Sequence, residues 1–187
     1  MESPRLFVAI EIPEAIRRDL DASLAPWRPK LAGARWVPSE NWHATLLFLG
    51  ATAADRVPWV RDRLDDIAGV ATSFATALTT FGGFPSAARA RVVWAGLDDR
   101  AGRMGDLARS GREALEGAPD DRPFAAHVTV ARSGTPQALP EGFLSVPLPA
   151  ATFRVGELVL FRSHPGRPAP RYEALARFPL GAGTESD

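Results

Sequence analysis

The sequence predicts an α+β fold in which a mostly antiparallel sheet carries a few helices on its outside. Two observations favour this class. Segments with strand-like apolar patterns outnumber segments with helical periodicity, and turn signals such as GGFPS separate them. The chain has 187 residues, 45% of them hydrophobic, which is enough to fill the core of one domain that folds alone.

The first predicted elements are a strand at 5–12, which Pro13 ends, and then a helix. In this helix Ile16, Leu20 and Leu24 recur on one face. The same reasoning places two further helices at 55–70 and 99–116, and strands at 35–37, 43–49, 73–81 and 91–97.

The last third of the chain is predicted to hold three strands, at 125–132, 153–162 and 172–178. Between the first two lies a segment rich in Pro and Gly, SGTPQALPEG, which we interpret as a surface loop because the composition does not change across it. The final residues, 181–187, are predicted to form a disordered tail.

The charges of the chain balance, with 22 Lys and Arg against 22 Asp and Glu. This balance gives no broad basic field for tight binding to long nucleic acids. Lys30 is the only lysine, so almost all of the basic residues are arginines, whose planar fork suits phosphate oxygens. A local phosphate pocket is therefore compatible with the composition.

Several classes of protein can be set aside or are disfavoured. The absence of cysteine excludes disulfides, thiolate zinc sites and a cysteine nucleophile. No apolar stretch has transmembrane length, and the start MESPRLFVAIEIPE does not form a secretory signal. We therefore expect a cytoplasmic protein without membrane contacts. We also expect a monomer, although no pattern in the sequence determines the oligomeric state.

The most informative feature is a repeated motif, HATL at 43–46 and HVTV at 127–130. Side chains alternate along a strand, so His43 and Thr45 point one way, and so do His127 and Thr129. A single strand histidine is most often structural. The repetition uses two of only three histidines, and this favours one cleft that both motifs line.

These residue types suit attack on a phosphodiester. Imidazole titrates near neutrality, so one histidine can take a proton while the other gives one. The hydroxyls of Thr45 and Thr129 can donate to the oxygens of the anion between the rings. A nearby arginine can neutralise its charge, and Arg132 is the arginine closest in sequence to either motif.

A metal site and a serine-hydrolase site are the alternatives to acid–base catalysis by two histidines. Each motif pairs His with Thr rather than with another metal ligand, there is no HExxH, and Glu40 and Asp55 lie at no recognised ligand spacing. No G-x-S-x-G occurs either. We therefore expect no metal and no cofactor.

The two motifs and their flanking segments resemble the 2H phosphoesterases. Within these, the chain is most similar to the bacterial and archaeal RNA 2′,3′-cyclic phosphodiesterases, also called the 2′-5′ RNA ligase family. The resemblance extends over about 5–180. Besides the motifs, it rests on RLFVAI (5–10), RWVPSENWHATLLFLG (35–50), RVVWAGL (91–97) and RYEALARFPL (171–180).

The resemblance implies a single bilobal domain at 1–180, with two pseudo-symmetric lobes of mostly antiparallel sheet and outer helices around a central cleft. It also implies metal-independent hydrolysis of the 2′,3′-cyclic phosphate at the end of an RNA or oligonucleotide, or of a mononucleotide, to a 2′-phosphate. Ligation through a 2′-5′ linkage would be the reverse reaction.

The resemblance also implies roles for individual residues. His43 would be the general acid that protonates the leaving 3′ oxygen, and His127 would be the base that activates water. Thr45, Thr129 and Arg132 would bind the phosphate oxygens. Two departures, Trp42 in place of a smaller aliphatic residue and an altered FRSHPGRPAPRYE segment, could affect which base is preferred.

Other candidate residues have ordinary structural explanations beside functional ones. Phe7, Trp36 and Tyr172 could stack on a base of an RNA end, although each could equally pack in the core. Arg91 could bind phosphate but is more easily explained by a surface ion pair. His164 is expected to be exposed and uninvolved.

Two other functions stay open at this stage. The cleft could belong to a module that binds nucleotides or RNA ends with little turnover. Binding alone would not require both imidazoles, so their presence is weak evidence against this alternative. It could also belong to a phosphodiesterase for a small cyclic nucleotide, for which the same four residues would serve.

Overall fold

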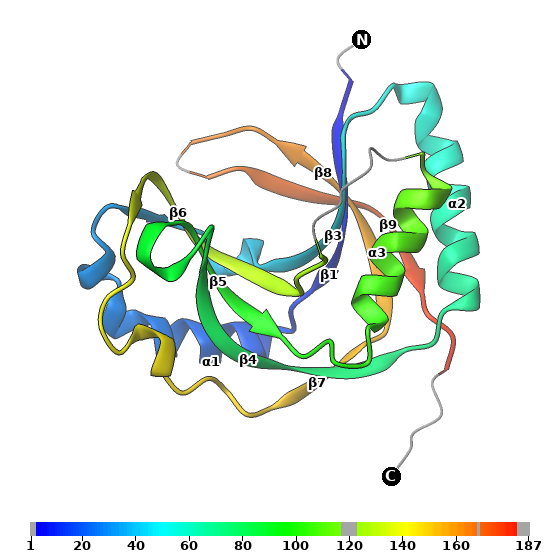
Figure 1. Ribbon diagram of the computed structural model, residues 1–187. Coiled ribbons are helices and arrows are strands. Elements are labelled where there is room, and N and C mark those ends of the chain that lie inside the picture. Colours follow the sequence, from blue (N-terminus) through cyan, green and yellow to red (C-terminus); the bar gives the residue numbers. More distant parts are fainter. Residues whose placement is uncertain (1–2, 117–122, 168, 183–187) are drawn as a thin grey trace.

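The structure, a computed structural model, describes residues 3–116, 123–167 and 169–182. In this part of the chain a sheet of nine strands has the order β7-β4-β5-β6-β3-β1-β8-β9, and β2 pairs with β6 beside this path (Figure 1). All of these strand pairs are antiparallel, as predicted. The strands are β1 (Arg5–Glu11), β2 (Ala34–Trp36), β3 (His43–Ala51), β4 (Phe74–Phe84), β5 (Ala90–Leu97), β6 (His127–Gln137), β7 (Thr152–Val155), β8 (Glu157–His164) and β9 (Arg171–Pro179).

Two half-sheets meet in the middle of this sheet, between β3 and β6. One half is β3-β1-β8-β9 and the other is β6-β5-β4-β7. The pairing between β3 and β6 consists of Ala44 opposite Val128. Each half-sheet begins at the joint with a strand that starts in a His-x-Thr motif. This arrangement confirms the predicted bilobal α+β architecture.

Among the residues that the structure describes, three α-helices cover the outside: α1 (Glu14–Leu24), α2 (Val57–Val70) and α3 (Arg103–Ala114). As predicted, α1 buries Ile16, Leu20 and Leu24 in the main core. Helices α2 and α3 lie side by side on the β3-β1-β8-β9 half (Figure 1). Short 3-10 helices are η1 (Ala25–Trp27), η2 (Pro29–Leu31), η3 (Ser39–Asn41), η4 (Ala54–Arg56), η5 (Ala87–Arg89) and η6 (Phe143–Ser145).

The predicted helix at 99–116 begins four residues later than expected. Asp99 lies outside the helix, where its carboxylate accepts the backbone N–H groups of Met104 (2.8 Å) and Gly105 (2.9 Å). This satisfies donors that the first turn leaves unpaired. Asp99 therefore caps α3 from outside instead of forming its first residue.

The prediction of one strand at 153–162 is wrong. The segment is divided at Gly156 into β7, which pairs with β4, and β8, which pairs with β1 and β9. The chain therefore crosses from one half-sheet to the other at the single residue Gly156, between two runs of strand-forming residues. Apolar patterning does not detect this change, because both halves bury the same kinds of side chain.

Two predicted breaks between strands are also wrong. Strand β4 runs through Gly82 and Gly83 to Phe84, and β6 runs on to Gln137, into the predicted loop. Gly82 lies under the indole ring of Trp94 on the neighbouring strand, so the glycine gives room for that ring. The end of β6 is held by pairing on both sides, with β2 and β5.

The predicted disordered tail starts with an ordered residue. The N–H of Gly181 donates to the carbonyl of Ala71, and the carbonyl of Gly181 accepts the N–H of Ser73. Residues 183–187 of the predicted tail lie outside the described residues. None of the helices that the structure describes is long and apolar enough to cross a membrane.

The close packing of Trp94 on Gly82 leads to a stability prediction. A Cβ atom added at Gly82 would lie 2.1 Å from a ring carbon of Trp94, so Gly82→Ala should lower the free energy of unfolding by about 1–3 kcal/mol. A Cβ atom added at Gly69, in α2, would have no atom within 4 Å, so Gly69→Ala should raise stability by about 0.5–1 kcal/mol. Urea unfolding of both variants measures the contrast, and equal effects would contradict the packing.

Candidate active site

The joint between the two half-sheets brings the two motifs together. Ala44 and Val128, which pair there, are the middle residues of the two His-x-Thr segments. Side chains alternate on both strands, so both histidines and both threonines lie on the face opposite to these two buried residues. In antiparallel register, His43 lies on the side of Thr129 and Thr45 on the side of His127.

A register shift follows each threonine and changes which later residue reaches this face. In β3, Leu46 has no opposite residue in β1, and in β6, Val130 has none in β5. Each extra residue reverses the alternation of the strand. The third residue after each threonine therefore lies on the same face as the motif. This residue is Arg132 on β6 and Phe48 on β3.

Main-chain carbonyls orient both imidazoles in the same way. Nδ1 of His43 lies 2.7 Å from the carbonyl oxygen of Asn41, and Nδ1 of His127 lies 2.7 Å from that of Ala125. A carbonyl only accepts, so Nδ1 of each neutral ring carries the proton and Nε2 stays available for proton transfer. Because the acceptors are main-chain atoms two residues upstream, no side-chain pattern in the sequence could indicate them.

Aromatic side chains form a wall against each histidine. The ring of His43 lies 4.9 Å from that of Phe7 and 5.2 Å from that of Tyr172, which it meets edge-on. The ring of His127 meets Phe84 edge-on at 5.0 Å, and Trp94 lies 6.3 Å away. Phe84 and Trp94 were not among the predicted site residues. Trp94 lies opposite Thr129, a register that becomes apparent only once β5 and β6 are paired.

Of the three aromatic residues that the sequence suggests for base stacking, the structure places two at the cleft and the third on the opposite face of the sheet. Phe7 is only 4% exposed and stacks on Phe161 in a small cluster on the cleft face. Tyr172 is half-buried, beside that cluster. Trp36 lies opposite Ala131 and packs against the main core, so it is on the other face and the structure does not bring it to the cleft.

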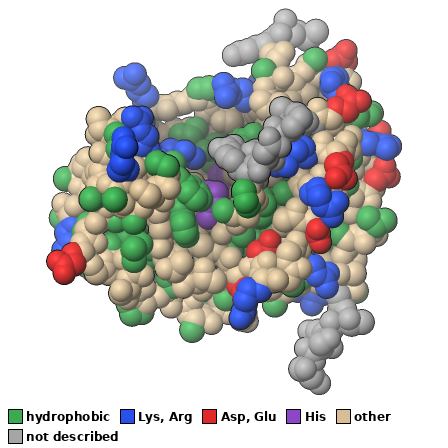
Figure 2. Space-filling view, in the orientation of Figure 1, with side chains coloured by type: hydrophobic (Ala, Val, Ile, Leu, Met, Phe, Trp, Pro, Cys, Tyr) green, Lys and Arg blue, Asp and Glu red, His purple; other side chains and the backbone are tan. Residues whose placement is uncertain are grey.

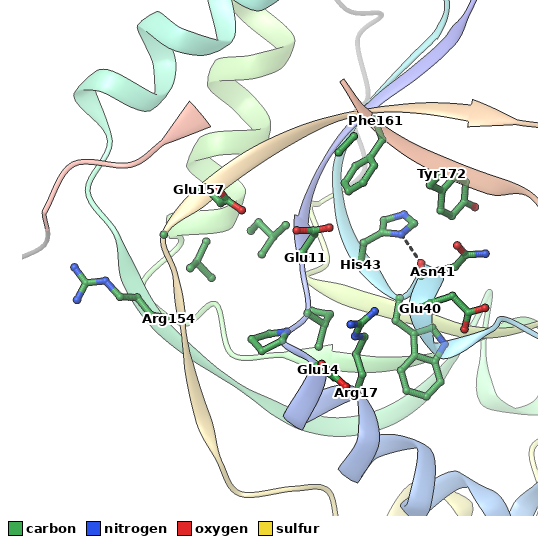
Figure 3. Close-up of a pocket in the computed structure, with 17 residues that line it drawn as sticks. Glu11, Glu14, Arg17, Glu40, Asn41, His43, Arg154, Glu157, Phe161 and Tyr172 are labelled. Atoms are coloured by element: carbon green, nitrogen blue, oxygen red, sulfur yellow. Dashed lines mark hydrogen bonds between the residues drawn. The ribbon is translucent and has the colours of Figure 1, made fainter. Parts of the chain in front are cut away.

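Two cavities meet at His43. One, of about 230 Å³, is lined by both threonines together with His43, Arg132 and Phe48. The other, of about 460 Å³, has charged side chains including Glu11, Glu14, Arg17 and Glu40 (Figure 3). Figure 2 shows histidine at the bottom of a hollow, with Lys and Arg side chains gathered along one part of its rim. The residues that line both cavities are His43, Asn41 and Tyr172.

Burial keeps both histidines neutral in the free site. It lowers the pKa of His43 to about 4. The hydrogen bond to Asn41 acts against this effect, whereas the positive charge of Arg132, and that of His127 when it is protonated, lower the pKa further. Burial likewise lowers the pKa of His127, and Arg132 adds to that effect. His127 lines neither of the two cavities that meet at His43, and its link to the site is the pairing of Ala44 with Val128 together with its electrostatic interaction with Arg132.

The remaining candidates from the sequence lie outside these cavities. Nε2 of His164 is 2.6 Å from a carboxylate oxygen of Glu173 on the neighbouring strand. Its side chain is 28% exposed, so His164 is half-buried rather than exposed as expected. Arg91 donates to the carbonyl of Gly134 at 3.3 Å. Within the described residues, no three His, Asp or Glu side chains are grouped so as to hold a metal ion.

The pKa of His43 predicts how stability depends on pH. In the unfolded chain this pKa is about 6.5, whereas in the folded protein it is about 4, so between these values the unfolded chain binds the proton more tightly. The free energy of unfolding therefore falls as the pH drops from 7 towards 4. We expect wild type to lose about 2 kcal/mol more than His43→Gln between pH 7 and 4.5 in urea unfolding. Equal losses would contradict the lowered pKa.

Comparisons with known sequences find relatives along almost the whole chain. A model of the family described as LigT like Phosphoesterase matches residues 10–94. A protein of Escherichia coli K12 named RNA 2′,3′-cyclic phosphodiesterase is 31% identical over 186 residues, which cover 96% of this chain and 98% of the relative. One of Geobacillus stearothermophilus with the same name is 30% identical over 185 residues, but these cover 96% of this chain and only 58% of that longer relative.

Solved structures share the fold of both lobes. The crystal structure of TT0787 of Thermus thermophilus has a TM-score of 0.79 and 30% identity, and covers 95% of this chain and 98% of that chain. The structure of E. coli LigT complexed with 3′-AMP has a TM-score of 0.76 and 29% identity, covering 96% and 99%. The protein therefore belongs to the LigT-like phosphoesterase family of 2H phosphoesterases, as the two motifs indicate.

Proposed function

We propose that the protein hydrolyses the terminal 2′,3′-cyclic phosphate of RNA or oligonucleotides, without a metal, to a 2′-phosphate. The observation that carries this proposal is the position of two His-Thr pairs and Arg132 on one face, at the joint of the lobes. The names of the relatives support the substrate, and the complex of E. coli LigT with 3′-AMP supports a nucleotide in the cleft.

In this proposal, the cyclic phosphate lies between the two histidines. Its non-bridging oxygens accept hydrogen bonds from the hydroxyls of Thr45 and Thr129, and the guanidinium of Arg132 supplies the opposite charge. Arg132 is exposed, so its guanidinium can turn to a ligand. As negative charge grows on the phosphorus oxygens in the transition state, these donors bind more strongly.

Each histidine then moves one proton. Nε2 of His127 takes a proton from water, and the water oxygen forms a bond to phosphorus. The bond between phosphorus and the 3′ oxygen breaks, and Nε2 of His43 gives its proton to that oxygen. The product carries a 2′-phosphate and a free 3′ hydroxyl. The two rings have exchanged protonation states, and solvent restores them.

The negative charge of the bound substrate favours the protonated histidine that this proton transfer requires. Without an anion in the site, both imidazoles are neutral near pH 7 because their pKa values are lowered. A bound phosphodiester monoanion raises the pKa of a facing imidazole and so favours uptake of one proton. The general acid therefore becomes charged mainly when a phosphate is present.

Ligation would use the same groups. If the 5′ hydroxyl of a second RNA end, rather than water, attacked the cyclic phosphate, the product would carry a 2′-5′ linkage. His127 would then deprotonate the attacking hydroxyl in the place of water. Water competes at a far higher concentration, so we propose hydrolysis as the main reaction.

The first test compares histidine variants on an oligonucleotide that ends in a 2′,3′-cyclic phosphate, in EDTA. His43→Ala and His127→Ala should each lose about 10²–10⁴ in kcat, because each removes a general acid or base. His164→Ala is the matched control and should keep full activity, since His164 pairs with Glu173 outside the cavities. Product analysis should show a 2′-phosphate from wild type.

Three outcomes would overturn the proposal: a strict metal requirement, activity that survives both substitutions, or a wild type that binds nucleotides without hydrolysing them. The last would favour the binding module. Faster turnover of 3′,5′-cyclic nucleotides than of the RNA end would favour the small-nucleotide phosphodiesterase.

The pH dependence provides a second test. In the active form the two histidines together carry one proton. The plot of kcat/KM against pH should therefore be bell-shaped, with two limbs at the apparent pKa values of the free histidine pair. Both values should lie below about 6.5, because the pKa values of both histidines are lowered. Bound phosphate raises both pKa values. The two limbs of the pH profile of kcat should therefore lie about 1–3 pH units higher than those of the kcat/KM profile. Samples returned to pH 7 before assay check for unfolding. Coincident profiles would contradict the role of phosphate in protonating the pair.

A further inference from the structure

Two arginines face each other across neighbouring strands at the edge of the cleft. Arg35 of β2 lies directly opposite Arg132 of β6 in the antiparallel register. Residues paired in this way lie on the same face of a sheet, with Cβ atoms about 4.5–5.5 Å apart, and like charges at such positions are destabilising. The pair therefore does not contribute to the stability of the sheet, and a functional reason for it has to be sought.

No charge among the described residues neutralises this pair. Within the described part of the chain, neither Arg35 nor Arg132 has a side-chain hydrogen bond or an ion pair. Both side chains are exposed. On the other side of β6, the residue opposite Arg132 is Val92, which is uncharged. An anionic ligand would supply the counter-charge that these neighbours do not.

Arg35 lies at the edge of the smaller cavity and does not line it. Val37, which follows β2 and donates its N–H to the carbonyl of Val130, lines this cavity of about 230 Å³ together with Arg132. Alternate residues of an extended chain point to the same side, so Arg35 shares the face of Val37 and lies roughly 6–7 Å farther along. Arg35 is therefore placed to meet a second anion, outside the cavity that holds the first.

The charges of the two cavities indicate where a polyanion would leave the site. The residues that line the smaller cavity include Arg5 and Arg132 but no Asp or Glu. The larger cavity is lined by four glutamates and two arginines, namely Glu11, Glu14, Glu40, Glu157, Arg17 and Arg154. A strand of phosphates is attracted to the smaller cavity and repelled from the larger one. It would therefore leave over the edge formed by β2 and β6.

We propose that Arg35 binds the phosphodiester that joins the terminal nucleotide of an RNA to the rest of the strand, while Arg132 binds the cyclic phosphate. The planar fork of an arginine matches two oxygens of such a linkage. The bound anion also relieves the repulsion between the two arginines. This inference rests on the proposed function, and it names the substrate class as an oligonucleotide rather than a mononucleotide.

The test changes the charge of one linkage. Steady-state kinetics are measured with a dinucleotide that ends in a 2′,3′-cyclic phosphate, and with the same dinucleotide whose internal linkage is an uncharged methylphosphonate. Wild type should have a KM about 5- to 30-fold lower for the charged dinucleotide, as for one charge-assisted contact. Arg35→Gln should abolish this difference by raising KM for the charged dinucleotide. KM for the uncharged dinucleotide and for a nucleoside 2′,3′-cyclic phosphate should not change.

Three controls separate a contact with phosphate from a structural role. Arg35→Lys keeps the charge and should restore part of the preference, whereas Arg61→Gln removes an exposed arginine of α2 and should change nothing. The slope of log KM against log salt concentration for the charged dinucleotide should fall by about 0.7 in Arg35→Gln, as for one phosphate of a single strand. Because Arg35 faces another cation, Arg35→Gln should not lower the Tm of the free protein.

The inference is wrong if wild type does not distinguish the two dinucleotides, or if Arg35→Gln raises KM for both alike. It is also wrong if Arg5→Gln removes the preference and Arg35→Gln does not, because the strand would then leave past β1. Calorimetric titration with the two dinucleotides that end in a 2′-phosphate gives the same comparison without turnover. If wild type hydrolyses neither substrate but Arg35→Gln selectively weakens binding of the charged dinucleotide, the proposed reaction is wrong and the role of Arg35 stands.

Discussion

The pairing of Ala44 with Val128 is the constraint on which the site depends. It is the point at which the two half-sheets are joined, and both residues are buried, with exposures of 1% and 0%. Side chains alternate along each strand, so a shift of one residue at this joint would turn a histidine and a threonine into the core and an apolar residue into the cleft. The apolar middle residue of each motif therefore fixes where the polar residues on either side of it point.

Burial of the imidazoles has two linked effects. It holds each ring against an aromatic wall, with Nδ1 bound to a main-chain carbonyl, so that Nε2 has a fixed direction. It also lowers the pKa of His43 and His127, and this destabilises the charged form that an acid needs. An anion in the cleft offsets the second effect without disturbing the first. The same packing that positions the rings thus couples their protonation to the presence of phosphate.

The sequence indicated the parts of this site that follow from alternation, and it missed those that depend on pairing. His43, Thr45, His127 and Thr129 form two pairs, each two residues apart, so a strand places each pair on one face. Alternation alone would turn Arg132 away from Thr129, and only the extra residue Val130, visible in the register with β5, brings it back. Pairing likewise separates β7 from β8, takes Trp36 to the core, and brings Phe84 and Trp94 to His127.

The difference between the two lobes gives the cleft a direction. His and Thr are the same in both motifs, so these four residues alone would accept a cyclic phosphate in either orientation. The position after each extra residue breaks this equivalence, because it holds Arg132 in one lobe and Phe48 in the other. A nucleotide is asymmetric as well, because its charge lies at the phosphate. Since the guanidinium of Arg132 attracts that charge from one lobe only, one orientation is expected to be favoured, and the 3′ oxygen then faces the same histidine each time. The assignment of acid and base thus depends on a residue that takes no part in proton transfer.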